Sequence, residues 1–202
     1  MLQQSGYDGR GTQRLSDRVV QVGTDMLVNS RVLLALVALA GATWLFAPDG
    51  ALAQGGGCAM ERVAGTSRQI MRCADGVTIT AEGGARFNLV DRNRDGRPDA
   101  VSLRNKAVLV DVDRARRPDG FQVITPQAIA AVRGTRWAVD VKNGTTSVFV
   151  VRGSVAVGRP SAGGRVVLNV GEGVDVARGS GPLTVRRWPP ARAAALLARL
   201  GQ

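Results

Sequence analysis

The chain has 202 residues, and 45% of them are hydrophobic although aromatic residues supply only 4%. This length allows one domain and an export segment, and a core of this composition must be filled by Val, Ala, Leu and Ile, which favours β-strands. Because the sequence contains no histidine, it lacks the commonest general base and the usual zinc nitrogen ligand, and most hydrolase mechanisms are excluded.

The net charge is +11, and the whole excess lies after residue 53. Arginine carries nearly all of it, since Lys106 and Lys142 are the only lysines. These charges are scattered, and aromatic residues are too few to build a base-stacking platform, so we expect no nucleic-acid partner. The partner that such a basic surface indicates is an envelope protein or an acidic surface ligand, such as anionic lipid or lipopolysaccharide.

A basic residue, an apolar run and a small-x-small site follow one another near the start of the chain. Arg31 precedes the apolar residues 32–46, and after a Pro-Asp-Gly break comes the sequence Ala-Leu-Ala at 51–53. This order predicts a signal peptide at residues 32–53 that is cleaved after Ala53. We therefore expect a periplasmic or secreted protein of a Gram-negative type of bacterium.

An uncleaved membrane anchor is the alternative interpretation of the apolar run. Its fifteen residues, rising about 1.5 Å each, would span about 22 Å as a helix, which is short of the roughly 30 Å hydrocarbon core. We therefore expect membrane association only if the segment stays uncleaved. The residues before it, 1–31, form an N-terminal extension in which Met26 offers an alternative start.

Two cysteines, Cys58 and Cys73, lie in the segment 54–76 that follows the predicted cleavage site. In an oxidising compartment two neighbouring cysteines are expected to pair, so we predict a disulfide that tethers the mature N-terminus to the first strands. Lipidation of Cys58 is the alternative. It would need an aliphatic residue a few positions upstream, where the sequence has three glycines, and it would leave Cys73 unpaired.

Short β-rich runs separated by glycine-containing turns predict an all-β domain over residues 77–188. Trp137, Val139 and Val141 alternate with less apolar residues, which is typical of a strand with one buried face. The pair Asn143-Gly144 that follows predicts a tight hairpin. A turn about every ten residues fits both a twisted β-solenoid and a β-sandwich. The predicted strands are 77–81, 87–90, 101–103, 107–112, 121–124, 137–141, 147–151, 154–157, 165–170, 174–176 and 183–186.

Residues 189–202 carry the signals of a short C-terminal helix. Two prolines stand at its start, Ala and Leu fill its interior, and Gly201 ends it. Leu196, Leu197 and Leu200 share one face. We expect this helix to cap one end of the sheet core, and a partner-binding peptide is the alternative.

The oxygen side chains of Asp91, Asn93 and Asp95 stand at alternate positions, with Gly96 sixth and Asp99 ninth in the series. This is most of a calcium loop of the EF-hand type, and similar loops join β-strands in other calcium sites. The loop also contains three arginines and has serine where the bidentate glutamate would stand. A solvated turn held by side-chain to main-chain hydrogen bonds is therefore the alternative. Ca²⁺ is the one cofactor that the sequence suggests.

Two motifs in the middle of the chain point to a known family. The first is Thr125-Pro126-x-Ala128, and the second is Val132-Arg133-Gly134-Thr135-x-Trp137-x-Val139. Together with later Gly and Val positions, residues 121–176 resemble the FecR domain, a periplasmic module of bacterial signalling and envelope proteins. The resemblance implies an all-β, twisted solenoid-like domain without catalytic activity.

The motif residues have expected physical roles. Thr125-Pro126 fixes an extended entry, and Gly134 permits a tight turn that a Cβ would disfavour. We expect Arg133 to bind main-chain carbonyls of its own domain, with a partner carboxylate as the alternative. Trp137 is expected in the core rather than at a contact surface.

The regulators that give the family its name carry a cytoplasmic anti-sigma segment and a further C-terminal signalling domain. Residues 1–30 are too short for that segment, so we expect a stand-alone binding, scaffold or signalling-accessory module. A membrane-tethered signal-transduction regulator and a calcium-binding envelope protein are the alternatives. An enzyme would need a Ser–Lys pair with Lys106 or Lys142, or paired carboxylates among Asp111, Asp113 and Asp140, and nothing in the sequence fixes either geometry.

Overall fold

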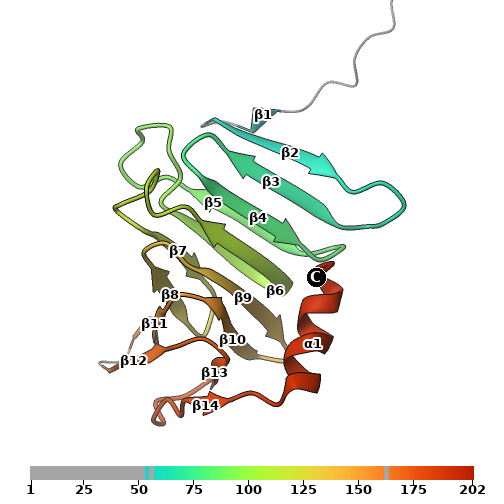
Figure 1. The fold of residues 1–202 in the computed structure, drawn as a ribbon. Helices are drawn as coiled ribbons and strands as arrows, with labels where there is room; N and C mark the ends of the chain where they lie inside the picture. The colour runs from blue at the N-terminus through green and yellow to red at the C-terminus, as the bar shows by residue number, and fades with distance from the viewer. Residues whose placement is uncertain (1–52, 55–56, 162–163) are drawn as a thin grey trace, which may run out of the picture. The chain divides into compact units, whose positions relative to one another are not determined.

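Strands make up most of the part of the chain that the computed structural model describes, residues 53–54, 57–161 and 164–202 (Figure 1). The predicted signal peptide, apart from its last residue Ala53, and the extension before it lie outside these residues. The strands are β1 (Ala53–Gln54), β2 (Cys58–Arg62), β3 (Gln69–Cys73), β4 (Val77–Ala81), β5 (Arg86–Val90), β6 (Ala100–Val112), β7 (Phe121–Ile124), β8 (Ile129–Val132), β9 (Arg136–Lys142), β10 (Thr145–Arg152), β11 (Val155–Gly158), β12 (Arg165–Leu168), β13 (Glu172–Ala177) and β14 (Arg186–Arg187), and the helix is α1 (Pro190–Arg199).

The long strand β6 belongs to two sheets at once. Its first half pairs with β5 and β7, and its second half, from Lys106 onward, pairs with β4 and β9. At this junction Lys106 has a φ of +60°, so the strand changes direction without ending, where the sequence predicted two separate runs. The order in sheet A is β1-β2-β3-β4-β6-β9-β10-β13-β14, and in sheet B it is β5-β6-β7-β8-β11-β12.

One apolar core draws its side chains from both sheets, as the valine-rich composition predicts. Trp137 and Val139 of sheet A and Leu103 and Val123 of sheet B belong to it, and all four are fully buried. Every described strand pair is antiparallel except β6 with β7. The all-β class is therefore confirmed, and the described strands form a curled half-barrel sheet around a shared core.

The sequence missed three strands near this core and misplaced a fourth. In β2 and β3 only alternate residues such as Met60 and Met71 pack inward, and the charged residues between them hide the pattern. The third missed strand, β8, is only four residues long. The last strand was predicted at 183–186, but β14 begins at Arg186, and the residues just before it pack on the core without joining the ladder.

The predicted C-terminal helix is present, but it does not cap an end of the core. It packs on the outer face of sheet A, where Leu196 and Leu200 form a second cluster with side chains of that sheet (Figure 1). Trp188 leads into the helix and stacks on Phe149 with ring centroids 5.1 Å apart. Gly173 makes this approach possible, because a Cβ there would lie 2.4 Å from the Trp188 Nε1 atom.

A double ion pair holds the end of α1 to sheet A. The Arg199 guanidinium lies 2.5 Å from a Glu82 carboxylate oxygen and 2.6 Å from one of Asp140. Burial by itself raises the pKa of Glu82, but the hydrogen bonds and positive charge of Arg199 outweigh it and hold that pKa below its ordinary value. The same carboxylates raise the pKa of Arg199.

The lowered Glu82 pKa predicts an acid-sensitive contribution to stability. A carboxylate whose pKa is lower in the folded state stabilises the fold above its unfolded pKa of 4.5, and the contribution is lost as the pH falls through the folded value. We expect Arg199→Met to be less stable than the parent protein at pH 7 and to lose less stability between pH 5 and 3. Urea unfolding across this pH range measures both, and an unchanged acid dependence in the variant would contradict the assignment.

The structure joins Cys58 and Cys73 in a disulfide. The two residues stand opposite each other in the β2–β3 hairpin, so the bond links two neighbouring strands near the start of sheet A. Replacing both with serine is expected to lower the free energy of unfolding by about 2–4 kcal/mol, because the unfolded chain gains the freedom of a 15-residue loop. Urea unfolding checks this. Equal midpoints for the parent protein with and without reductant would argue against a stabilising role.

Candidate functional site

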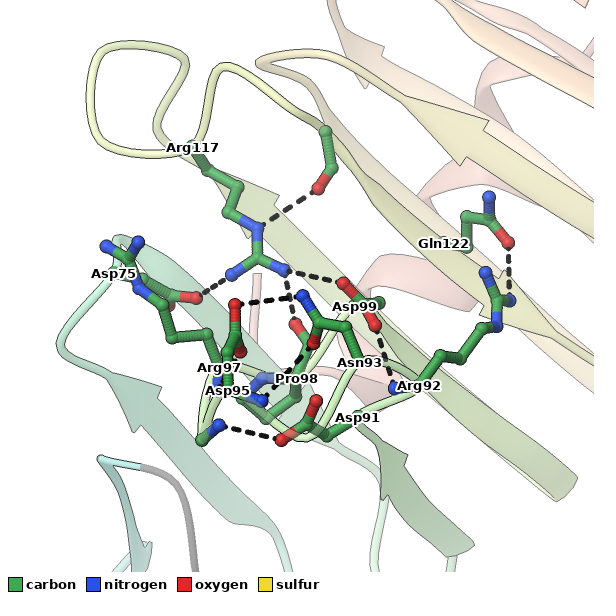
Figure 2. A network of polar contacts seen from close by, with 12 residues as sticks. Asp75, Asp91, Arg92, Asn93, Asp95, Arg97, Pro98, Asp99, Arg117 and Gln122 are labelled. Atoms are coloured by element: carbon green, nitrogen blue, oxygen red, sulfur yellow. Dashed lines mark hydrogen bonds and ion pairs between the residues drawn. The ribbon is translucent and has the colours of Figure 1, made fainter.

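Arg117 is the centre of a polar network that joins three connecting segments of the chain (Figure 2). Its side chain is 8% exposed and forms an ion pair with Asp75, which is 5% exposed. It also donates hydrogen bonds to the main-chain oxygens of Pro98, at 2.6 Å, and Gly120, at 3.1 Å. A carboxylate oxygen of Asp99 lies 3.6 Å away. Arg117 thereby fixes the base of the acidic loop that the sequence singles out.

In that loop the acidic side chains accept hydrogen bonds from main-chain N–H groups. Asp91 accepts from Arg94 and Gly96, at 2.7 and 2.9 Å, and Asp95 accepts from Arg97 at 2.8 Å. The bond from Arg97 is also the main reason that the pKa of Asp95 lies below its ordinary value.

The last carboxylate of the loop closes it. Asp99 accepts a hydrogen bond from the main-chain N–H of Arg92, at 2.9 Å. Figure 2 shows these bonds closing the loop on itself. In this structure the loop is a turn held by side-chain to main-chain hydrogen bonds, which is the alternative to a calcium loop that the sequence analysis gave.

Calcium binding by this loop stays a prediction. Among the residues that the structure describes, no group of three or more acidic, cysteine or histidine side chains is placed to hold a metal ion. If Asp91, Asn93, Asp95 and Asp99 do bind Ca²⁺, calorimetric titration should give a dissociation constant of about 0.1–1 mM, as in weak extracellular sites. The heat should be absent in Asp91→Ala. A parent protein that releases no heat at millimolar Ca²⁺ would remove the prediction.

Thr125 of the first family motif begins a buried polar network between the two sheets. Its hydroxyl oxygen accepts a hydrogen bond from the Ala128 N–H at 2.9 Å and lies 2.8 Å from the hydroxyl of Thr146. Thr146 in turn donates to the side-chain oxygen of Gln127 at 2.9 Å. All three polar side chains are buried, so Thr125-Pro126 sets a turn whose polar atoms are satisfied inside the protein.

Gly134, Thr135 and Trp137 of the second motif also serve to hold the fold together. Gly134 has a φ of +73°, and a Cβ there would lie 2.4 Å from the Cβ of Arg114, so only glycine allows this turn to approach the β6–β7 connection. Thr135 donates to the main-chain oxygen of Ser154 at 2.9 Å. Trp137 is fully buried in the shared core.

Arg133 is the motif residue that faces outward. It is exposed, and among the described residues it makes no hydrogen bond or ion pair, so the expected bonds to main-chain carbonyls are not observed there. It lines a hollow on the outer face of sheet B. The motif therefore places one arginine on a surface and its other residues in the scaffold.

The residues that the sequence offered as catalytic candidates each make a different structural contact. Lys106 donates to the main-chain oxygen of Gly83 at 2.6 Å, and Lys142 ends β9 beside the hairpin turn. The three carboxylates each face an arginine, in the pairs Asp111–Arg152, Asp113–Arg116 and Asp140–Arg199, at 2.7, 3.9 and 2.6 Å.

Sequence reasoning missed Arg117 and Asp75, which form the buried ion pair of the network. Arg114, Arg116 and Arg117 are alike in the sequence, and no pattern there separates the buried arginine from its exposed neighbours. Arg117 differs from its neighbours only in the folded protein, where the β3–β4, β5–β6 and β6–β7 connections meet around it.

Residues 61–156 match the family model described as FecR protein. The match includes β3, β4 and most of the strands of the shared core. No curated protein matches the sequence, and no helix in the described part of the chain is long and apolar enough to cross a membrane.

Two solved structures resemble this fold. Both are crystal structures from Parabacteroides distasonis ATCC 8503, at 2.50 and 1.65 Å resolution, of a protein described as a "putative anti-sigma factor". Sequence identity is 19% in both cases, with TM-scores of 0.53 and 0.52 over 69% and 68% of this chain. The similarity covers 64% of each of those chains, less than two thirds, and at this identity it concerns the fold alone.

Proposed function

We propose that this protein is an exported, non-enzymatic FecR-domain module that binds another component of the cell envelope and takes part in signalling as an accessory. The observation that carries the proposal is the FecR domain at residues 61–156. The anti-sigma description of the two structural neighbours supports a role connected with signalling. The apolar run 32–46 and the Cys58–Cys73 pair support a site of action outside the reducing cytoplasm.

A binding role also agrees with the contacts that the polar and charged side chains make. The buried polar side chains of the family motif serve turns and strand contacts, and the acidic candidates for catalysis face arginines. Arg133 remains on the surface with its guanidinium unoccupied by described residues. Exposed arginines recognise carboxylates and phosphates through paired hydrogen bonds, which suits an acidic partner.

Mass spectrometry of the protein from fractionated cells tests the export proposal. We expect a mature species that begins at Gln54, contains the disulfide and lies in the periplasmic or secreted fraction. A species in the membrane fraction that retains residues 32–53 would instead support the membrane-tethered regulator. Full-length protein in the cytosol with both thiols free would contradict both forms of the proposal.

A further inference from the structure

The outer face of sheet B carries a row of small and uncharged side chains that crosses four strands. Gln122, Ala131, Ala156 and Val167 are successive cross-strand neighbours in β7, β8, β11 and β12. Their sequence neighbours are turned into the core, so these four side chains point away from it. Val167 is 59% exposed. We call this row and the hollow of about 690 Å³ above it the sheet-B groove.

Three arginines line the sheet-B groove. They are Arg92, Arg133 and Arg165, and none of their guanidinium groups forms an ion pair with a carboxylate of the described residues. Arg92 donates to the side-chain oxygen of Gln122 at 2.8 Å, which turns it toward the row (Figure 2). Ala131, Ala156 and Val167 give the floor an apolar part, and the guanidinium groups of Arg133 and Arg165 beside it face no carboxylate of the described residues, so an acidic, partly apolar ligand would complement this surface.

Sheet A shows how this protein covers such a face. There α1 lays Leu196 and Leu200 over a floor that includes Ala107 and Ala138. Arginines of the helix flank this contact and meet carboxylates of the sheet, in the pairs Arg199–Glu82, Arg199–Asp140 and Arg192–Asp175, at 2.5, 2.6 and 2.5 Å. In the sheet-B groove the arginines belong to β12 and to the connections that follow β5 and β8, so the covering element must supply the carboxylates.

We infer that the sheet-B groove binds an amphipathic helix of a partner protein, with leucine-type side chains on the Ala131–Ala156 floor and acidic side chains against Arg133 and Arg165. The inference deepens the proposed function, since it names the surface and the chemistry of the partner. Asp99 and Asp119 also line the groove. These acidic groups disfavour a densely charged phosphate polymer or lipid surface and favour a polypeptide with spaced carboxylates.

A synthetic peptide tests the inference directly. The probe is a fluorescent peptide of about 18 residues with leucine at helical spacing i, i+3, i+4 and i+7 and glutamate on both flanks. Fluorescence anisotropy at low salt should show saturable binding to the parent protein. Arg133→Glu/Arg165→Glu should weaken it at least about tenfold by reversing both charges, and Ala156→Arg should do so by filling the floor.

Matched controls separate the groove from general attraction to a basic protein. Arg62→Glu/Arg178→Glu reverses the charge of two exposed arginines outside the groove and should bind the peptide like the parent protein. A peptide of the same composition in scrambled order should bind at least about tenfold more weakly, since it has no apolar face. Unchanged thermal unfolding midpoints would show that the variants are folded.

Three outcomes would overturn the inference. They are no binding of the ordered peptide, equal binding of the ordered and scrambled peptides, and equal binding by the parent protein and Arg133→Glu/Arg165→Glu. Preferential binding to phosphatidylglycerol vesicles that survives Ala156→Arg would assign the arginines to lipid instead. Export is measured separately by the mature N-terminus, so failure of the groove leaves the proposed function standing, and failure of export leaves the peptide result interpretable.

Discussion

Arg117→Met is expected to lower the free energy of unfolding by about 3–5 kcal/mol, because it leaves the buried Asp75 carboxylate without a counter-charge. The side chains of both residues are less than a tenth exposed. The main-chain oxygens of Pro98 and Gly120 also lose their donor. Urea unfolding followed by circular dichroism measures the loss.

The neighbouring arginine provides the matched control. The Arg116 side chain is 66% exposed and lies 3.9 Å from Asp113, so Arg116→Met should change stability by no more than about 0.5 kcal/mol. Asp75→Asn combined with Arg117→Met should cost less than the sum of the two single changes, since the double variant buries no unpaired charge. Similar losses for Arg116→Met and Arg117→Met would show that the network does not stabilise the fold.

Trp137→Ala is expected to cost about 3–5 kcal/mol, and the milder Trp137→Phe about 1–2 kcal/mol. The ring is fully buried between the two sheets, so alanine leaves a large cavity. The indole N–H has no acceptor among the described residues, so phenylalanine loses volume without losing a hydrogen bond. Denaturant unfolding of the three proteins gives the comparison. Equal losses for the two variants would mean that an unobserved polar contact, and not packing, holds Trp137.

The strands that the sequence predicted well are those with regular alternation and clear turns. β4 and β7 begin and end where predicted, and Asn143 and Gly144, with φ of +50° and +73°, form the expected hairpin. Short β-rich runs and the FecR resemblance both predicted the all-β class, and the pairing of Cys58 with Cys73 was predicted because they are the two cysteines of a chain that we expect to be exported.

What the sequence did not predict depends on contacts between distant residues. The strand β6 stays continuous through Lys106 because partners hold it on both sides, and a local pattern shows only an interruption. The position of α1 is set by Trp188 and by Glu82, which no helical periodicity identifies. The burial of Arg117 likewise arises from three connections that meet only in the folded protein.

The ion pair between Arg199 and Glu82 joins residues 117 positions apart. A polypeptide that leaves a ribosome or a translocation channel with its amino end first will therefore have presented every strand before this pair can form. Until then, the Phe149 and Ala107 side chains that α1 covers remain in contact with water. Packing of α1 thus follows the exit of every described strand, and until then a chaperone would meet a sheet with one uncovered side.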